Sequence, residues 1–176
     1  MSGIATLTHE TQSLIKHTKC KILDTRKTTP NFRVAEKWGV QIGGGLNHRI
    51  GLYDMVMLKD NHIDYCGGVS QAIENTLAYL AREKRSIPVI VETRTLAEVR
   101  ECFEFPELYR ILLDNMPVSL LREAVALVNG KIPTEASGNI TKETIVPVAE
   151  TGVDFISMGA ITYSAGVLDI SLKAVS

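Results

Sequence analysis

CKILDTRKTTPNFRVAEKWGVQIGGGLNHRIG, residues 20–51, is a short apolar run that ends in cations and hydroxyls, followed by a triple glycine and Asn-His-Arg. A buried strand that gives way at once to polar residues is typical of the sheet in an α/β protein, where binding sites lie at the strand ends. The crowding of cations, hydroxyls and glycines predicts a site for a small, highly charged anion.

The rest of the chain repeats this alternation of short apolar runs and longer amphipathic stretches. Buried strands are predicted at 20–24, 55–59, 88–92, 109–114, 132–136 and 154–159. Helical spacing of apolar residues predicts helices at 68–85, 95–104, 117–129 and 141–151. Alternating strands and helices predict an α/β fold with a parallel sheet and right-handed crossovers. The pattern alone leaves open whether this sheet stays open or closes into a barrel.

The composition is that of an ordinary soluble globular protein. The 176 residues are 45% apolar and 22% charged, with a net charge of −1, which gives no electrostatic footprint for nucleic acid or for a membrane surface. No apolar run approaches the roughly 18 residues of a membrane span, and the first residues lack a signal-peptide core. Three widely spaced cysteines, Cys20, Cys66 and Cys102, predict buried thiols in a reducing compartment. We therefore expect a cytoplasmic protein.

Polar or small residues follow every predicted strand. The six ends are 24–27, 59–62, 92–94, 114–115, 135–139 and 159–160. A single charged strand end is typical of a solvated loop, but the carboxyl ends of parallel strands all lie on one side of a sheet. Six such ends together predict one binding site.

The residue types at these ends indicate what the site binds. Positive charge comes from Arg26, Lys27, Arg49 and Lys59, and from His48 when it is protonated. Guanidinium and ammonium groups bind carboxylates and phosphates. Glu92 and Asp114 are acids suited to sugar hydroxyls or to a divalent metal. Two small-residue segments predict phosphate cradles: Ser137, Gly138 and Asn139, and then Gly159. Together these groups indicate a sugar carrying several phosphates and an acidic co-substrate.

Six motifs in this order resemble the quinolinate phosphoribosyltransferase family. They are DTRKTTPNFRVAEKWGV, GGGLNHRIGLYDMVMLKDNHI, VETRTL, ILLDNM, EASGNI and ISMGAITYSAGVLDISL, and they cover essentially the whole chain. The resemblance implies an open, incomplete α/β barrel of six or seven parallel strands, similar to a TIM barrel. It also implies a reaction of quinolinate with phosphoribosyl pyrophosphate that yields nicotinate mononucleotide, pyrophosphate and CO2.

The resemblance also implies a role for each site residue. Arg26, His48 and Arg49 match the family's quinolinate carboxylate binders, and Lys27 and Lys59 match residues that serve substrate and diphosphate. Glu92 and Asp114 match the acids that hold the ribose and help to place Mg²⁺, indirectly through diphosphate or water. Four residues match the 5′-phosphate cradle: Ser137, Gly138, Asn139 and Gly159. Lys27, Lys59, Glu92 and Asp114 are the expected catalytic residues.

The family resemblance further implies the organisation of the chain. Residues 1–18 are expected to be a helix linking an absent N-terminal domain, 19–166 the barrel domain, and 167–176 a C-terminal tail. The absent domain is expected in cis or in trans, within a homodimer or hexamer. Two departures from the family pattern are Asn31 and Tyr163, and no catalytic role is assigned to Tyr163. Two other interpretations remain: a related phosphoribosyltransferase for another acidic substrate, and an inactive anion-binding fragment.

Overall fold

A single parallel sheet forms the centre of the computed structural model, which describes residues 1–174. Its strands are β1 (Lys21–Leu23), β2 (Val56–Leu58), β3 (Val89–Thr93), β4 (Arg110–Asp114), β5 (Thr134–Ser137) and β6 (Phe155–Ser157). The six strands lie in the order β1-β6-β5-β4-β3-β2, and every pair is parallel. The predicted α/β class with an open parallel sheet is confirmed, and each predicted strand overlaps an observed one.

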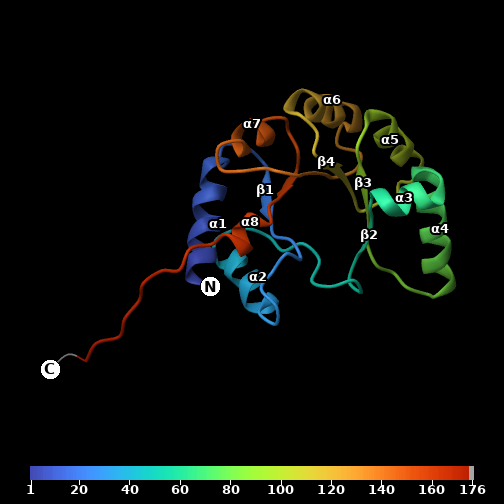
Figure 1. Cartoon of the computed structure of the whole chain (residues 1–176). Helices are drawn as coiled ribbons and strands as arrows, with labels where there is room; N and C mark the ends of the chain where they lie inside the picture. The colour runs from blue at the N-terminus through green and yellow to red at the C-terminus, as the bar shows by residue number, and fades with distance from the viewer. Residues whose placement is uncertain (175–176) are drawn as a thin grey trace.

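Helices cover the outer side of the curved sheet in an arc (Figure 1). They are α1 (Ser2–Leu14), α2 (Arg33–Ile42), α3 (Asp60–Cys66), α4 (Val69–Arg82), α5 (Leu96–Glu101), α6 (Val118–Val128), α7 (Ile145–Ala149) and α8 (Ala160–Tyr163), with a 3-10 turn at Cys102–Glu104. The predicted helices correspond to α4, α5, α6 and α7. Helices α2, α3 and α8 lie in stretches for which no helix was predicted from periodicity.

The open side of the sheet lies between its two edge strands, β1 and β2. After α2 the chain pairs briefly with β1, through a parallel bridge between Leu23 and Leu46. Residues 47–55 then cross to β2 (Figure 1). This crossing segment carries His48 and Arg49, so two of the predicted site residues lie where a closed barrel would have further strands.

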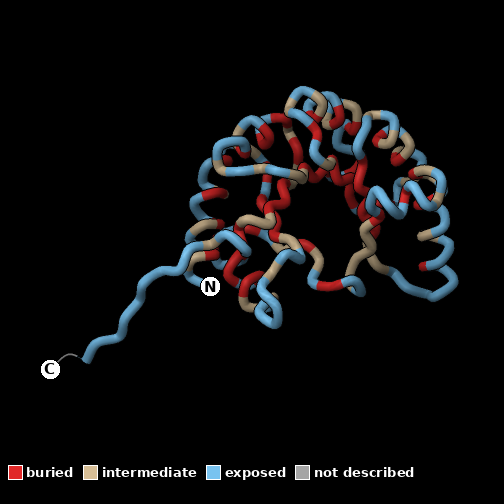
Figure 2. The backbone as a smooth tube through the Cα atoms, in the orientation of Figure 1, coloured by how far each residue is buried: buried red, intermediate tan, exposed pale blue. Residues whose placement is uncertain are grey.

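The core lies along the strands and the inward sides of the helices (Figure 2). All five residues of β3 are buried, as are the first four of β4. Strands that are buried on both faces give continuous apolar runs rather than alternation, which is why these two were predictable. Helix α5 begins with a capping box, in which Thr95 and Glu98 satisfy each other's backbone N–H groups.

Helix α2 buries two charged residues beside Val40 and leaves three large apolar residues exposed. Glu36 and Lys37 are buried, and Glu36 accepts a hydrogen bond from the Thr29 N–H at 3.0 Å. Val34, Trp38 and Ile42, one turn apart on the helix, are 77%, 60% and 60% exposed. We call Val34, Trp38 and Ile42 the outer face of α2.

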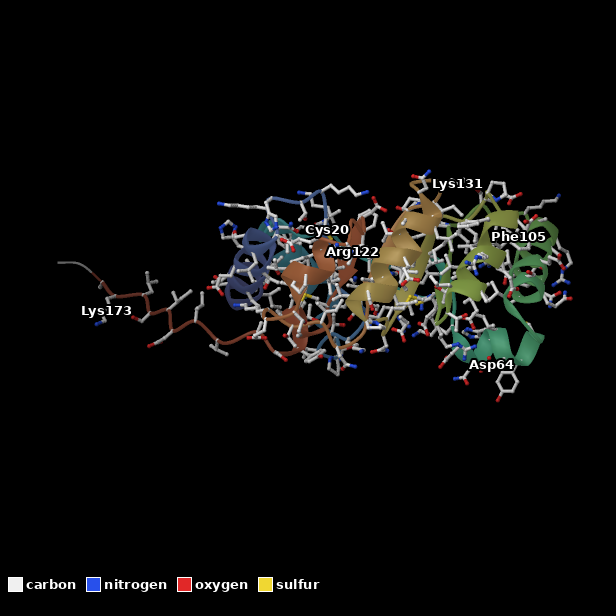
Figure 3. All side chains as sticks on the ribbon, turned by 90° about the horizontal axis from the view of Figure 1, so that it is seen from above. Cys20, Asp64, Phe105, Arg122, Lys131 and Lys173 are labelled. Carbon is white, nitrogen blue, oxygen red and sulfur yellow. The ribbon has the colours of Figure 1, made fainter. Side chains whose placement is uncertain are left out.

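The C-terminal tail begins beside α1 and then leaves the body of the protein (Figure 1). A Cβ on Gly3 would lie 1.8 Å from the Gly166 carbonyl oxygen, so the first turn of α1 packs against the start of the tail. Residues 165–174 then form no helix or strand and run away from the body, with Lys173 near the far end (Figure 3). Within residues 1–174, no helix is both long enough and apolar enough to span a membrane.

All three cysteines are free, as predicted. Cys20 and Cys102 are buried, and burial raises the pKa of each thiol to about 12, so both remain protonated and unreactive. Cys66 differs from the prediction because it is only partly buried.

Candidate active site

A pocket of about 480 Å³ opens at the carboxyl ends of the strands. All eleven predicted site residues line it: Arg26, Lys27, His48, Arg49, Lys59, Glu92, Asp114, Ser137, Gly138, Asn139 and Gly159. Parallel strands and the register of the sheet bring them together; Asp114, for example, lies opposite Ser137 across β4 and β5. Two other strand-end residues stay outside the pocket. Asp24 is buried beneath it, and Arg94 is paired with Asp64 and Glu98.

Cations gather where β1 meets the crossing segment. Burial, and secondly the nearby charge of Arg26, lower the pKa of the Arg49 guanidinium from its ordinary value. Arg33 joins the two loops, because its guanidinium donates to the carbonyls of Arg26 at 3.1 Å and Ile50 at 2.9 Å. Cations held close together form a site for a ligand that carries several negative charges.

Acidic groups occupy the middle of the pocket wall. Lys59 Nζ donates to Glu92 Oε2 at 3.2 Å, and Glu92 is buried whereas the lysine side chain is half exposed. The Asn115 amide donates to Asp114 Oδ2 at 2.7 Å, and the Asn139 amide donates to Asn115 Oδ1 at 3.0 Å. These bonds hold the carboxylates at fixed places while leaving oxygen lone pairs free for hydroxyl groups or a cation.

The two carboxylates fit Mg²⁺ in one particular way. Within the part of the chain that the structure describes, no three His, Cys, Asp or Glu side chains come together as a metal site. Mg²⁺ is commonly bound by one or two carboxylates together with substrate phosphates and water. Glu92 and Asp114, which end neighbouring strands, suit that mode and not a cage made of protein ligands alone.

Small residues form the adjoining part of the wall, after β5 and β6. Gly138 has a φ of +96° and Asn139 a φ of +50°, so the backbone turns sharply and presents its N–H groups to the pocket rim. At Gly159, an added Cβ would lie 2.6 Å from the Tyr163 ring and 3.1 Å from Lys27 Cδ. Glycine at these two positions lets backbone, asparagine, tyrosine and lysine come close together.

The Gly138 position gives a first testable prediction. In Gly138→Ala, the methyl group would lie 2.3 Å from Asn115 Oδ1 in a backbone conformation that alanine disfavours. We expect a loss of about 1–3 kcal/mol in the free energy of unfolding and weaker binding of the phosphorylated sugar that the sequence predicts as a ligand, measured by calorimetry.

Gly130→Ala is the matched control for this variant. Gly130 also has positive φ, +72°, but an added Cβ there meets no atom within 4 Å and lies outside the pocket. Gly130→Ala should lower the free energy of unfolding without changing the affinity for the ligand. Equal loss of affinity in both variants would contradict the assignment of Gly138 to the phosphate wall.

The sequence did not predict a buried ion pair that lies at the base of the pocket. Arg110 Nη1 donates to Glu135 Oε2 at 2.6 Å, and both side chains are buried. His48 Nε2 lies 3.4 Å from the same carboxylate oxygen. Burial alone would raise the pKa of Glu135, but the His48 ring and the Arg110 guanidinium outweigh it and lower that pKa. The sequence feature that could have indicated this pair is Glu135, an acid among the small residues of the motif TEASGN.

A second buried ion pair joins β1 to α2. Lys37 Nζ donates to Asp24 Oδ1 and also to the His48 carbonyl at 2.9 Å. The His48 N–H donates to Asp24 Oδ1 at 2.8 Å. With the Asn47 amide oriented to satisfy its neighbours, its nitrogen donates to Asp24 Oδ2 at 2.7 Å. Burial raises the pKa of Asp24 and lowers that of Lys37, and the attraction between them opposes both shifts.

His62, interpreted from the sequence as a capping or packing residue rather than a base, does cap a helix. Its Nδ1 accepts the Lys59 N–H at 3.0 Å at the start of α3. Tyr163, to which no role was assigned, lines the pocket beside Gly159. The pocket wall thus changes in chemistry along the strand order: cations after β1, the glycine-rich segments after β6 and β5, the acids at β4 and β3, and Lys59 after β2. Such a site can hold a polyanionic sugar and a second anion at the same time.

Comparison with known proteins gives one consistent result. Residues 4–173 match the family model described as "Quinolinate phosphoribosyl transferase, C-terminal domain". The chain is 51% identical to the chloroplastic nicotinate-nucleotide pyrophosphorylase [carboxylating] of Oryza sativa subsp. japonica, over 98% of this chain and 50% of that protein. It is 42% identical to the probable nicotinate-nucleotide pyrophosphorylase of Bacillus subtilis, over 98% of this chain and 58% of that protein.

A solved structure agrees with these relatives. NadC from Streptococcus pyogenes superposes with a TM-score of 0.89 at 40% identity, over 98% of this chain and 60% of that one. The chain therefore spans about half the length of the curated plant relatives that it matches.

Proposed function

Because the chain belongs to the quinolinate phosphoribosyltransferase family, we propose that it carries the active-site pocket for transfer of a phosphoribosyl group from phosphoribosyl pyrophosphate to quinolinate. The overall reaction yields nicotinate mononucleotide, pyrophosphate and CO2. It is one step in the synthesis of pyridine nucleotides.

The observation that carries this proposal is the order of chemical groups around the pocket. The strand order brings Lys59, Glu92 and Asp114 together in sequence along β2, β3 and β4, and then the small residues after β5 and β6. Arg26 follows β1, next to β6, and Arg49 lies on the crossing segment at the open side. This order supports a ribose held by acids, a 5′-phosphate at the glycine-rich wall and a dicarboxylate at the guanidinium groups.

In the proposed reaction the pyridine nitrogen forms a bond to ribose C1 as the bond from C1 to the pyrophosphate oxygen breaks. Positive charge develops at C1, and Glu92 and Asp114 lie where they can stabilise it. Lys27 and Lys59 balance the negative charge of the departing pyrophosphate. The carboxylate at ring position 2 then leaves as CO2, its bonding electrons stay on the ring beside the cationic nitrogen, and that carbon takes a proton from solvent.

We propose Mg²⁺ as the cofactor, held by Glu92 and Asp114 through water or diphosphate oxygens. When bound, it would supply positive charge to the pyrophosphate leaving group. We also propose a cytoplasmic location, supported by the three free cysteines. Some relatives carry the words chloroplastic or mitochondrial in their names.

Product formation is the test of this function. Quinolinate and nicotinate are each incubated with phosphoribosyl pyrophosphate, Mg²⁺ and the chain, and mononucleotide is measured by chromatography. Because the relatives are about twice as long, the assay is repeated with the remaining part of a relative added. Turnover of quinolinate alone supports the proposal. Turnover of another acid would favour a related phosphoribosyltransferase, and ligand binding without turnover under either condition would favour an inactive anion-binding fragment.

Arg49→Lys gives a second prediction, on substrate binding. The Arg49 guanidinium is half-buried and already donates to the Met55 carbonyl at 3.0 Å, which fixes its plane. A lysine keeps the charge but cannot make a forked contact to a carboxylate. We expect quinolinate affinity to fall about tenfold or more, whereas the affinity for phosphoribosyl pyrophosphate changes little. Unchanged quinolinate affinity in calorimetry would remove Arg49 from the carboxylate site.

Self-association is the third prediction, because we propose that the protein works as a homodimer or as a hexamer built from dimers. The outer face of α2 and the tail residues Val167, Ile170 and Leu172 expose large apolar side chains, and such surfaces commonly mark interfaces. Light scattering at micromolar concentration is expected to give at least the mass of a dimer. A monomer with full turnover would contradict the proposal.

A further inference from the structure

Arg33, the first residue of α2, joins the two segments that carry Arg26 and Arg49. Its Nη2 donates to the Arg26 carbonyl at 3.1 Å, and its Nη1 donates to the Ile50 carbonyl at 2.9 Å. Its Nε donates to Thr28 Oγ1 at 3.0 Å. All three nitrogens of the guanidinium therefore bond to the protein, and Arg33 itself is not among the residues that line the pocket.

These bonds are the link between the loop after β1, residues 25–32, and the crossing segment. Within the described residues 1–174, no hydrogen bond directly joins residues 25–32 to residues 49–55. Nearer to the sheet, Asp24 bonds to the main chain of Leu46 and of His48. Beyond those residues, the hydrogen bonds that hold the two segments at a fixed spacing run through Arg33.

The loop after β1 is also fixed on its other side. Thr162 of α8 donates to the Lys27 carbonyl at 2.8 Å. The main-chain carbonyls of Arg26 and Lys27 are thus both taken up by side chains from helices, whereas the side chains of these two residues line the pocket. Helix α2, from which Arg33 reaches both segments, is anchored in the core by the fully buried Val40.

The two guanidinium groups at the pocket would separate without such a link. After burial, the nearby charge of Arg26 is what lowers the pKa of the Arg49 guanidinium, so the two like charges lie close enough to repel each other. Arg33 opposes that separation through main-chain carbonyls, and so it leaves the N–H groups of both guanidinium groups available to a ligand. Two guanidinium groups at a fixed spacing suit an acid that carries two carboxylates.

We propose that Arg33 is a positioning residue, which sets the spacing between the guanidinium groups of Arg26 and Arg49 and thereby favours an acid with two neighbouring carboxylates over an acid with one. It acts through the main chain of the two segments and does not contact the ligand. This inference rests on the proposed function in one respect, that Arg26 and Arg49 bind the carboxylates of the substrate.

Two variants of Arg33 separate this role from a role of its charge alone. Arg33→Ala removes both the charge and the link. Arg33→Lys keeps the charge, but a single ammonium nitrogen cannot span the three oxygens that the guanidinium reaches. In calorimetric titrations, we expect both variants to bind quinolinate about tenfold or more weakly than the original chain does, and to bind nicotinate, which has one carboxylate, within about threefold of it.

Arg122→Ala is the matched control. Arg122 is an exposed arginine of α6 outside the active-site pocket, so both affinities should stay unchanged. Circular dichroism and thermal melting check the folding of each variant, and the milder Arg33→Lys keeps the test available if Arg33→Ala does not fold. Original quinolinate affinity in Arg33→Lys would mean that the charge suffices, and equal losses for the two acids would mean general damage to the pocket. Either result would overturn the proposal.

A measurement without ligand distinguishes failure of this inference from failure of the proposed function. The N–H groups of Thr28 and Ile50 are each hydrogen-bonded within their own segment, so their hydrogen exchange, followed by NMR, reports on both sides of the link. We expect exchange at both to be about tenfold or more faster in Arg33→Lys than in the original chain, and unchanged in Arg122→Ala. If the original chain does not bind quinolinate, the proposed substrate is wrong, and the exchange rates still decide whether Arg33 joins the two segments. Unchanged exchange in Arg33→Lys would overturn the positioning role.

Discussion

Lys59→Ala is expected to lower turnover by about a hundredfold or more while leaving the fold intact. The side chain is half exposed and contributes little to the core, but its ammonium lies 3.2 Å from Glu92 at the end of β2. It can act on charge that develops only as the bond to pyrophosphate breaks, so its loss should affect kcat more than KM. Steady-state measurement of CO2 release, with melting curves for both proteins, checks this.

Glu92→Ala is expected to act in the same direction, because it removes the carboxylate that pairs with Lys59. Lys131→Ala is the control: this exposed lysine follows α6 and lies outside the pocket, with its Nζ 5.4 Å from the centre of the Phe103 ring. Near-normal turnover in Lys59→Ala would remove that lysine from the catalytic residues. A loss of similar size in Lys131→Ala would mean that the assay reports stability rather than chemistry.

Lys37→Met is expected to have the largest effect on stability, about 3–5 kcal/mol of the free energy of unfolding. Lys37 and Asp24 are 2% and 0% exposed, so removing the ammonium leaves a carboxylate buried without its countercharge. Most of the loss should be recovered in the double variant Asp24→Asn with Lys37→Met, since the amide carries no charge. Urea unfolding, followed by circular dichroism, measures the free energy of unfolding of the single and the double variant.

Lys19→Met makes the same substitution in an exposed ion pair. Lys19 Nζ lies 2.7 Å from Asp154 Oδ1, but the lysine is 63% exposed, and such pairs contribute at most about 1 kcal/mol. If Lys37→Met cost no more than Lys19→Met, the buried pair would not be a determinant of the fold.

Strands β3 and β4 could be predicted because burial on both faces makes them nearly continuous apolar runs. Strand β3 was predicted at 88–92 and lies at Val89–Thr93, and β4 was predicted at 109–114 and lies at Arg110–Asp114. The site was predictable for a related reason: parallel strands bring their polar carboxyl ends to one side whatever the details of the helices. All eleven chosen residues therefore line one pocket, although their individual roles stay predictions.

Residues whose surroundings depend on distant parts of the chain could not be predicted. Glu135 follows Thr134 in a strand where either could have pointed outward, and its partner Arg110 lies 25 residues earlier. Asp24 belongs by position to the polar ends, yet it is buried under the pocket by a lysine from α2. Charged residues are rarely buried, so a prediction from sequence places Glu135, Arg110 and Asp24 at the surface.

Helix α2 shows that apolar spacing alone can assign the wrong face of a helix to the core. Its apolar residues Val34, Trp38 and Ile42 recur at helical spacing, but that face is exposed, and the buried face includes Glu36 and Lys37. A hydrophobicity profile would assign its two faces in reverse. An engineer who wanted to reduce self-association of this protein could replace these three exposed residues with polar ones and leave the interior unchanged. The same engineer, trusting hydropathy, would instead spare those three and replace Glu36 or Lys37 as dispensable surface charges. Loss of Lys37 would remove its bond to the His48 carbonyl, next to Arg49, and loss of Glu36 would remove its bond to the Thr29 N–H.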